Sequence, residues 1–95
     1  MIAVTVRQDG IIINGHAGYA EAGKDIVCAG VTALTETLVK SLEGISGDVI
    51  ECDISSGKAD IRFRNLSEEG KLLVDSFFVG ICSIAEDFPE YVKIR

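Results

Sequence analysis

Two stretches of the chain have the pattern of a hairpin, and each is followed by a helical pattern. The first covers residues 2–13 with an Asp-Gly turn, and the second covers residues 50–63 with a Ser-Ser-Gly turn. Residues 2–7 alternate in side-chain type before their turn and three isoleucines follow it, whereas residues 50–63 alternate apolar and polar residues on both sides of the turn. A period of two is typical of a strand with one buried face, and an Asp-Gly pair is a strong hairpin signal. The repeated order of hairpin and helix predicts an α+β domain, in which two helices cover an antiparallel or mixed sheet.

The two helical segments differ in how much of their surface is apolar. Over residues 25–43 apolar side chains recur every three or four positions, Glu36 and Lys40 are spaced for an exposed ion pair, and Gly44 is expected to end the helix. Over residues 71–88 the pattern is apolar around most of the helix. It predicts either a core helix between the sheet and the first helix or a helix in a homodimer interface. The closing YVKIR is expected to add a short strand.

The length and charge of the chain limit its possible partners. Its 95 residues fit one domain over residues 1–95, and 15 acidic against 9 basic residues give a net charge of −6. The basic surface that attracts nucleic acid is missing, so a basic protein or peptide is the better partner. Apolar runs are shorter than the roughly 20 residues that cross a bilayer, and the first residues lack the order of a signal peptide. We expect a cytoplasmic protein that binds neither membrane nor nucleic acid directly.

The cysteines favour free thiols. Cys28, Cys52 and Cys82 are odd in number and form no CxxC pair, which argues against a disulfide framework and against structural zinc. Cys52 falls on the apolar phase of its strand and Cys82 among apolar helix residues, so both are expected in the core. We expect neither a metal nor a cofactor.

The segment between the first hairpin and the first helix contains a pattern typical of phosphate-binding loops. Gly18 to Lys24 satisfies GxxxxGK between a predicted strand and a predicted helix. Asp25 stands where the motif requires Ser or Thr, Glu21 adds a second carboxylate, and the preceding strand belongs to a hairpin. GHAG also fits the GxxG of a loop that clamps nucleic acid, which the acidic composition disfavours. Nucleotide binding therefore remains only a minor alternative.

The single histidine and the first cysteine flank this segment. Asp25 is a preferred N-cap residue, which places Cys28 in the first helical turn, where unpaired N–H groups and the helix dipole favour a thiolate. The N–H groups of Cys28 and Ala29 are candidate oxyanion donors. The connector is long enough to bring His16 to the sulfur as a base. The spacing equally allows a solvated histidine and a cysteine packed in the core.

The stretch GHAGYAEAGKDIVCAGVTAL resembles the signature of the bacterial ribosomal-processing cysteine protease family, Prp. In that family a GHA turn precedes a helix start of the form D-(I/V)-V-C-A-(A/G)-V-(S/T), and the length and element order extend the resemblance over the whole chain. The resemblance implies a homodimeric cysteine endopeptidase. Its implied substrate is the N-terminal extension of the large-subunit ribosomal protein numbered twenty-seven, cut before a small residue that follows paired aromatic residues.

The same resemblance assigns roles to individual residues. His16 becomes the catalytic base, Cys28 the nucleophile and Asp25 a supporting carboxylate, which either orients His16 or only caps the helix. Thr32 stands where the family often has serine, and it either lines the site or bonds back to its own helix.

The loop itself has two interpretations. Gly15, Gly18 and Gly23 are expected to let it open for a peptide and close over it, with Tyr19 placed to meet the substrate. The alternative is an ordinary mobile surface loop. For the whole protein, the alternative to a protease is a non-catalytic, dimeric module associated with the ribosome.

Overall fold

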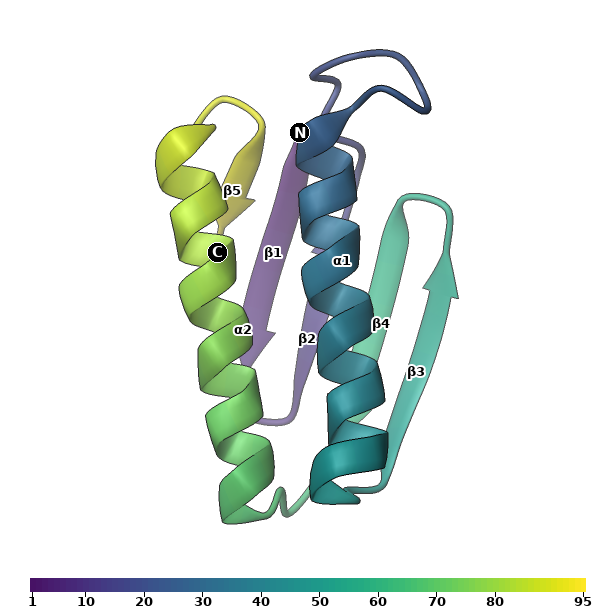
Figure 1. Ribbon diagram of the computed structural model, residues 1–95, viewed down its shortest axis with the longest axis vertical. Coiled ribbons are helices and arrows are strands. Elements are labelled where there is room, and N and C mark those ends of the chain that lie inside the picture. The colour runs from purple at the N-terminus through teal and green to yellow at the C-terminus, as the bar shows by residue number, and fades with distance from the viewer.

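Two hairpins and a short last strand form one five-stranded sheet in the computed structural model, which describes residues 1–95. In chain order the elements are β1 (Ile2–Arg7), β2 (Gly10–Asn14), α1 (Ile26–Ser41), a π-helical turn (Leu42–Ser46), β3 (Ile50–Ser55), β4 (Lys58–Phe63), α2 (Glu68–Asp87) and β5 (Val92–Ile94). The strand order is β3-β4-β2-β1-β5, and the β1–β5 pair alone is parallel. Both helices lie on one face of this sheet (Figure 1). The predicted α+β class with a mixed sheet is confirmed.

The core lies between the sheet and the two helices. Alternation turns Val4 of β1, Ile11 of β2 and Ile61 of β4 toward the helices, and all three are fully buried. Ile11 and Ile61 are opposite each other in the register of β2 and β4, so the two hairpins join through apolar residues. Val31 of α1 and Ile81 of α2 add to this core from the helix layer. Burying a side chain of this size stabilises the fold by roughly 1.5–3 kcal/mol.

The end of the first helix differs from the prediction. Gly44 does not end it, because the chain continues through the π-helical turn and leaves it at Gly47, whose φ of 69° is left-handed. Leu42 is fully buried at the start of this turn, and its carbonyl accepts hydrogen bonds from the backbone N–H groups of Gly47 and Asp48. A glycine with positive φ is the usual helix stop, and Gly47 is the one that adopts it.

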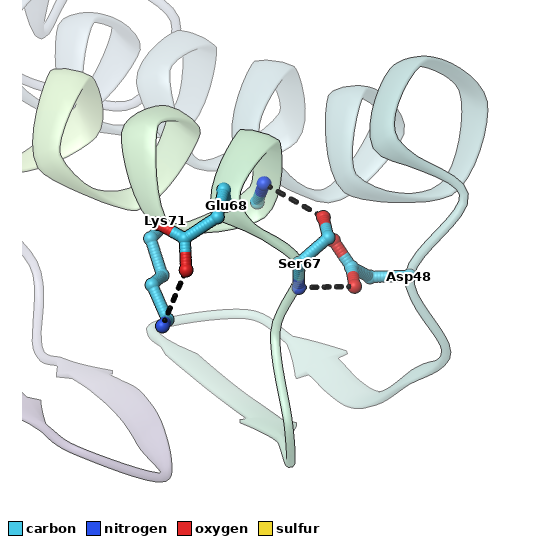
Figure 2. Close-up of polar contacts among 5 residues, drawn as sticks. Asp48, Ser67, Glu68 and Lys71 are labelled. Atoms are coloured by element: carbon cyan, nitrogen blue, oxygen red, sulfur yellow. Dashed lines mark hydrogen bonds and ion pairs between the residues drawn. The ribbon is translucent and has the colours of Figure 1, made fainter.

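Asp48 connects the end of this turn to the start of α2 (Figure 2). Its carboxylate accepts the Ser67 backbone N–H at 2.9 Å and the Ser67 hydroxyl at 2.8 Å, while Ser67 itself caps α2 by accepting the Gly70 N–H at 3.0 Å. The Ser46 hydroxyl donates to the same carboxylate at 2.6 Å. Hydrogen bonds from Ser46 and then from Ser67 lower the pKa of Asp48.

Strand β3 is the uncovered edge of the sheet. Cys52 pairs with Ile61 and Ile54 pairs with Ala59, so these β3 residues point to the helix side as the alternation predicts. Cys52 is nevertheless exposed and Ile54 is 51% exposed, because α1 does not extend over β3 (Figure 1). The prediction that Cys52 belongs to the core is wrong. Cys82, in α2, is half-buried.

Helix α2 is apolar on two sides with different surroundings. Phe77 and Ile81 are buried in the core, whereas Leu72 and Val79 are 69% and 70% exposed on the outer side. The core-helix interpretation accounts for the inner side only. Neither this helix nor α1 is long and apolar enough to cross a membrane.

Candidate active site

The ends of several elements meet at one end of the molecule: the end of β2, the loop that follows it, the first turn of α1 and the β3–β4 turn (Figure 1). A cavity of about 290 Å³ opens there, and Gly15, His16, Cys28 and Thr32 all line it. An adjoining hollow shares His16, Cys28 and Thr32 with the cavity and is completed by loop residues that include Gly18, Gly23 and Asp25. Tyr19 lines neither of them. Except for Tyr19, the structure therefore gathers the predicted site residues around the cysteine.

Asp25 caps α1 as predicted. Its Oδ1 accepts the N–H groups of Val27 and Cys28, both at 3.0 Å, and its backbone carbonyl accepts the N–H of Ala29 at 3.1 Å. The expectation that Cys28 and Ala29 offer free oxyanion donors is therefore wrong, since both N–H groups are already bonded. An N-cap satisfies just those first-turn donors that would otherwise be free.

Cys28 receives a donor that the sequence did not reveal. The backbone N–H of Ala17 donates to Cys28 Sγ at 3.2 Å, and Ala17 is itself buried. Sulfur accepts such a bond better as a thiolate than as a thiol, because a charged acceptor makes the stronger hydrogen bond. Residue type gives no signal for this contact, since any residue except proline supplies a backbone N–H.

The second oxygen of Asp25 holds the loop. Oδ2 accepts the N–H groups of Tyr19 at 2.9 Å and Ala20 at 3.3 Å. The hydrogen bond from the Cys28 N–H, followed by those from Ala20, Tyr19 and Val27, lowers the pKa of Asp25. Both oxygens are thus engaged by backbone donors and neither bonds His16, so the structure shows the capping role of Asp25 without the orienting one.

His16 lies against the β3–β4 turn. A Cβ built on Gly57 would be 2.6 Å from Nε2 of His16, and Gly57 accepts the N–H of Gly15 at 2.7 Å through its carbonyl. Gly57 also has a φ of 73°, which L side chains rarely adopt. The imidazole makes no hydrogen bond to Cys28 Sγ in this conformation. Sequence reasoning treated Gly57 only as a turn residue and missed its contact with the histidine, which depends on pairing between the two hairpins.

Glycines shape the loop that joins β2 to α1, and Tyr19 fastens it a second time. Gly15, Gly18 and Gly23 have φ values of 99°, 70° and 86°, so each occupies a conformation that suits glycine. The ring of Tyr19 packs edge-on against Phe88 and Tyr91, with centroids 5.5 and 5.2 Å away. Tyr19 therefore ties the loop to the end of α2 instead of facing the cavity.

Thr32 differs from the other threonines of α1. Thr35 and Thr37 each donate to a carbonyl one turn earlier, at 2.7 Å. The hydroxyl of Thr32 has no partner within the chain, and the side chain is exposed on the cavity wall. The back-bond that was one of the two roles considered for Thr32 is therefore not formed, and the residue lines the cavity.

The phosphate-binding alternative finds no structural support. Strand β2 pairs antiparallel with both of its neighbours, whereas a phosphate-binding loop follows a strand of a parallel sheet. Lys24, the lysine of that pattern, pairs with Glu21 at 3.0 Å. No group of three or more His, Cys, Asp or Glu side chains is placed to hold a metal ion.

A cysteine at a capped helix start, in a cavity that a histidine also lines, brings together the two residue types that cysteine hydrolases use as nucleophile and base. Residues 1–93 match the family described as Cysteine protease Prp. The ribosomal processing cysteine protease Prp of Mycoplasma genitalium is 44% identical over 97 residues, which cover 100% of this chain and 95% of that protein. The protein of the same name from Bacillus subtilis is 28% identical over 107 residues, covering 99% and 96%. The chain belongs to the Prp cysteine protease family.

Solved structures agree with this assignment. Prp from S. aureus with a covalently linked product peptide superposes with a TM-score of 0.90 at 26% identity, covering 99% of this chain and 95% of that one. The S. aureus enzyme with a substrate peptide gives a TM-score of 0.83 at 25% identity, with the same coverage.

Proposed function

We propose that this protein is a cysteine endopeptidase that removes the N-terminal extension of the large-subunit ribosomal protein numbered twenty-seven, with Cys28 as nucleophile and His16 as general acid and base. The observation that carries the proposal is the Ala17 N–H donated to Cys28 Sγ, in a cavity that His16 also lines. The N–H points at the sulfur atom that attacks the carbonyl and at the negative charge that the sulfur regains when the thioester is hydrolysed. The ribosomal-processing activity named for the relatives supports the same chemistry.

The reaction has two halves. Cys28 Sγ attacks the scissile carbonyl carbon, and the tetrahedral intermediate collapses to a thioester as His16 gives a proton to the departing amine. His16 then takes a proton from water, which attacks the thioester and frees the carboxylic acid and the sulfur. The covalently linked product peptide of the S. aureus relative supports a covalent intermediate.

In this proposal Asp25 acts by position. Its carboxylate fixes the turn that carries Cys28 through one oxygen and the loop through the other. Gly15, Gly18 and Gly23 are the hinges about which the loop opens for a peptide, which also lets the His16 ring rotate toward Sγ. Thr32 lines the channel in which the peptide lies.

The expected partner is basic. A net charge of −6 attracts a positively charged ribosomal precursor over a distance that salt limits to about 8–10 Å. A cytoplasmic location, where ribosomal proteins are processed, stays a prediction.

Cleavage of a peptide that spans the extension and its junction tests the activity. Under reducing conditions the intact protein should release both fragments in a mass spectrum, whereas Cys28→Ala and His16→Ala should release neither. Cys52→Ala is the matched control, because Cys52 is an exposed thiol outside the cavity and its removal should leave the rate unchanged. Full cleavage by Cys28→Ala, or none by the intact protein, would contradict the protease and favour a non-catalytic module.

Alkylation compares the thiols directly. Cys52 is exposed and Cys28 is half-buried, so accessibility alone predicts faster modification of Cys52. If the surroundings of Cys28 activate its sulfur as a nucleophile, iodoacetamide near neutral pH should label Cys28 first, by roughly tenfold. Peptide mapping after a short pulse reads both rates, and equal or reversed rates would remove the evidence for an activated sulfur.

We further propose that the protein is a homodimer that pairs through the outer side of α2. Leu72 and Val79 are seven residues apart, so they lie on the same side of the helix, and both are exposed. Sedimentation velocity should give a dimer for the intact chain and a monomer for Val79→Glu. A dimer that survives this substitution would place the interface elsewhere.

A further inference from the structure

Three residues of α1 form a stripe along the wall of the cavity. Cys28, Thr32 and Glu36 are spaced four apart, so their side chains follow one another on one side of the helix. All three line the cavity and the adjoining hollow. The stripe begins at the nucleophile and ends at a carboxylate.

Glu36 is a carboxylate without a cationic partner. The ion pairs of the chain are Lys24–Glu21, Arg62–Asp60 and Lys71–Glu68. The pair with Lys40 that the helical spacing predicted is therefore not formed. Glu36 is exposed. Among the residues that line the cavity, Lys58 is the one lysine or arginine. A ligand in the cavity meets a free negative group at this point.

The helix fixes how far this charge is from the reacting sulfur. From residue 28 to residue 36 an α-helix rises about 12 Å, at 1.5 Å per residue. An extended peptide covers that length in three or four residues, at roughly 3.3 Å each. A peptide that runs along α1 with its scissile bond at Cys28 therefore brings its third or fourth neighbouring residue to Glu36.

We propose that Glu36 is a specificity-determining residue that selects a lysine or arginine three or four residues from the scissile bond. This inference rests on the proposed function, because it places the scissile bond at Cys28. The pair is exposed to solvent, so its effect on kcat/KM is modest, up to about fivefold at low salt, and falls in about 0.5 M salt. The effect is carried by KM, because the ion pair forms equally with the ground state and the transition state.

A lysine scan tests the assignment. The probes are junction peptides with alanine at every charged position and one lysine placed at successive positions, up to about five residues on either side of the scissile bond. Each is assayed with the intact protein, with Glu36→Gln and with Glu36→Lys. Glu43→Gln is the control, since Glu43 is an exposed acid of the adjoining π-helical turn outside the cavity.

The expected result is a maximum in kcat/KM for lysine at the third or fourth position on one side, present in the intact protein and in Glu43→Gln. Glu36→Gln should flatten this maximum, and Glu36→Lys should turn it into a minimum at the same position, because the two positive charges repel each other. A flat profile in the intact protein, or a maximum unchanged in Glu36→Gln, would overturn the inference while leaving the protease in place. No cleavage of any peptide by the intact protein would overturn the proposed function, and the inference with it.

Discussion

Both helices begin beside an aspartate, at opposite ends of the molecule (Figure 1). Asp25 binds the first turn of α1 with one oxygen and the loop with the other. Asp48 binds Ser67, the cap of α2, and Ser46 at the end of the preceding π-helical turn. In each case one carboxylate joins a helix start to a second segment, and hydrogen bonds lower its pKa.

What separates the two starts is the residue in the first turn. At α1 it is Cys28, whose sulfur faces a cavity, whereas at α2 it is Gly70, packed so closely that a Cβ there would collide with the Asp48 carboxylate. The same device therefore serves the proposed active site at one end and packing at the other. The comparison predicts that changes at the Asp25 end reduce catalysis and that changes at the Asp48 end reduce stability.

The largest effect is expected at Asp25. Asp25→Ala removes the helix cap and the loop contact together, so kcat/KM for the junction peptide should fall roughly a hundredfold, as misplaced catalytic groups do, and Tm should fall too. Asp25→Asn keeps one acceptor for the cap but presents an amide NH₂ to Tyr19 and Ala20, so we expect a loss of about tenfold at nearly unchanged Tm. An Asn variant as active as the intact protein would assign no role to the loop contact.

The next largest effect on activity should distinguish two turns that each contain a glycine with a left-handed backbone. Gly57 and Gly47 both have left-handed φ values, 73° and 69°, but a Cβ meets His16 only at Gly57 and finds open space at Gly47. Asn tolerates this conformation, so Gly57→Asn and Gly47→Asn should lose similar stability. Gly57→Asn should also lower kcat/KM about tenfold and alter the pH–rate profile, because His16 is displaced. Equal activity in the two variants would show that the turn does not position His16.

A smaller effect is expected at the other helix start. Ser67→Ala removes the cap of α2 and one partner of Asp48, which should destabilise the fold by about 1 kcal/mol in urea unfolding. The kcat/KM of the folded fraction should not change, since Ser67 is remote from the cavity. A selective loss of activity would mean that the two ends of the molecule are coupled.

The smallest expected effect is on how the free energy of unfolding depends on acid pH. The pKa values of Asp25 and Asp48 are lower in the folded chain than the ordinary 3.8, so the unfolded chain binds these protons first as pH falls. The stability they contribute is fully present above about pH 4–5 and is lost as pH falls through the folded values. In the double variant Asp25→Asn with Asp48→Asn, the free energy of unfolding should decline less steeply between pH 6 and 3 than it does in the control variant Asp75→Asn. Asp75 is an exposed aspartate. Identical slopes would contradict the contribution of these hydrogen bonds.

Much of the fold follows from local patterns. Alternation and turn dipeptides predict the strands because one face must be buried, and the Asp25 cap predicts where α1 begins. The errors occur where burial depends on distant segments. Cys52 lies on the correct face of its strand, but no helix extends over it. Gly44 looks like a helix stop, yet buried Leu42 and the left-handed Gly47 move the end of the helix.

The candidate site divides in the same way. His16, Cys28 and Asp25 can be singled out from residue type and a family signature. Three contacts cannot be predicted in this way: the donor to Cys28, the bonds to both Asp25 oxygens and the contact of Gly57 with His16. The first two come from backbone N–H groups, and the third depends on the lack of a Cβ in glycine.

By itself the sequence determined the α+β order, the capped helix start and the cysteine and histidine that flank the loop, since these depend on periodicity and on residues near in the chain. Only the tertiary structure decided that Ala17 donates to the sulfur, that the second hairpin supports His16 and that Glu36 faces the same cavity. The physical reason is that pairing of β2 with β4 brings together residues separated along the chain, and periodicity carries no information about that register.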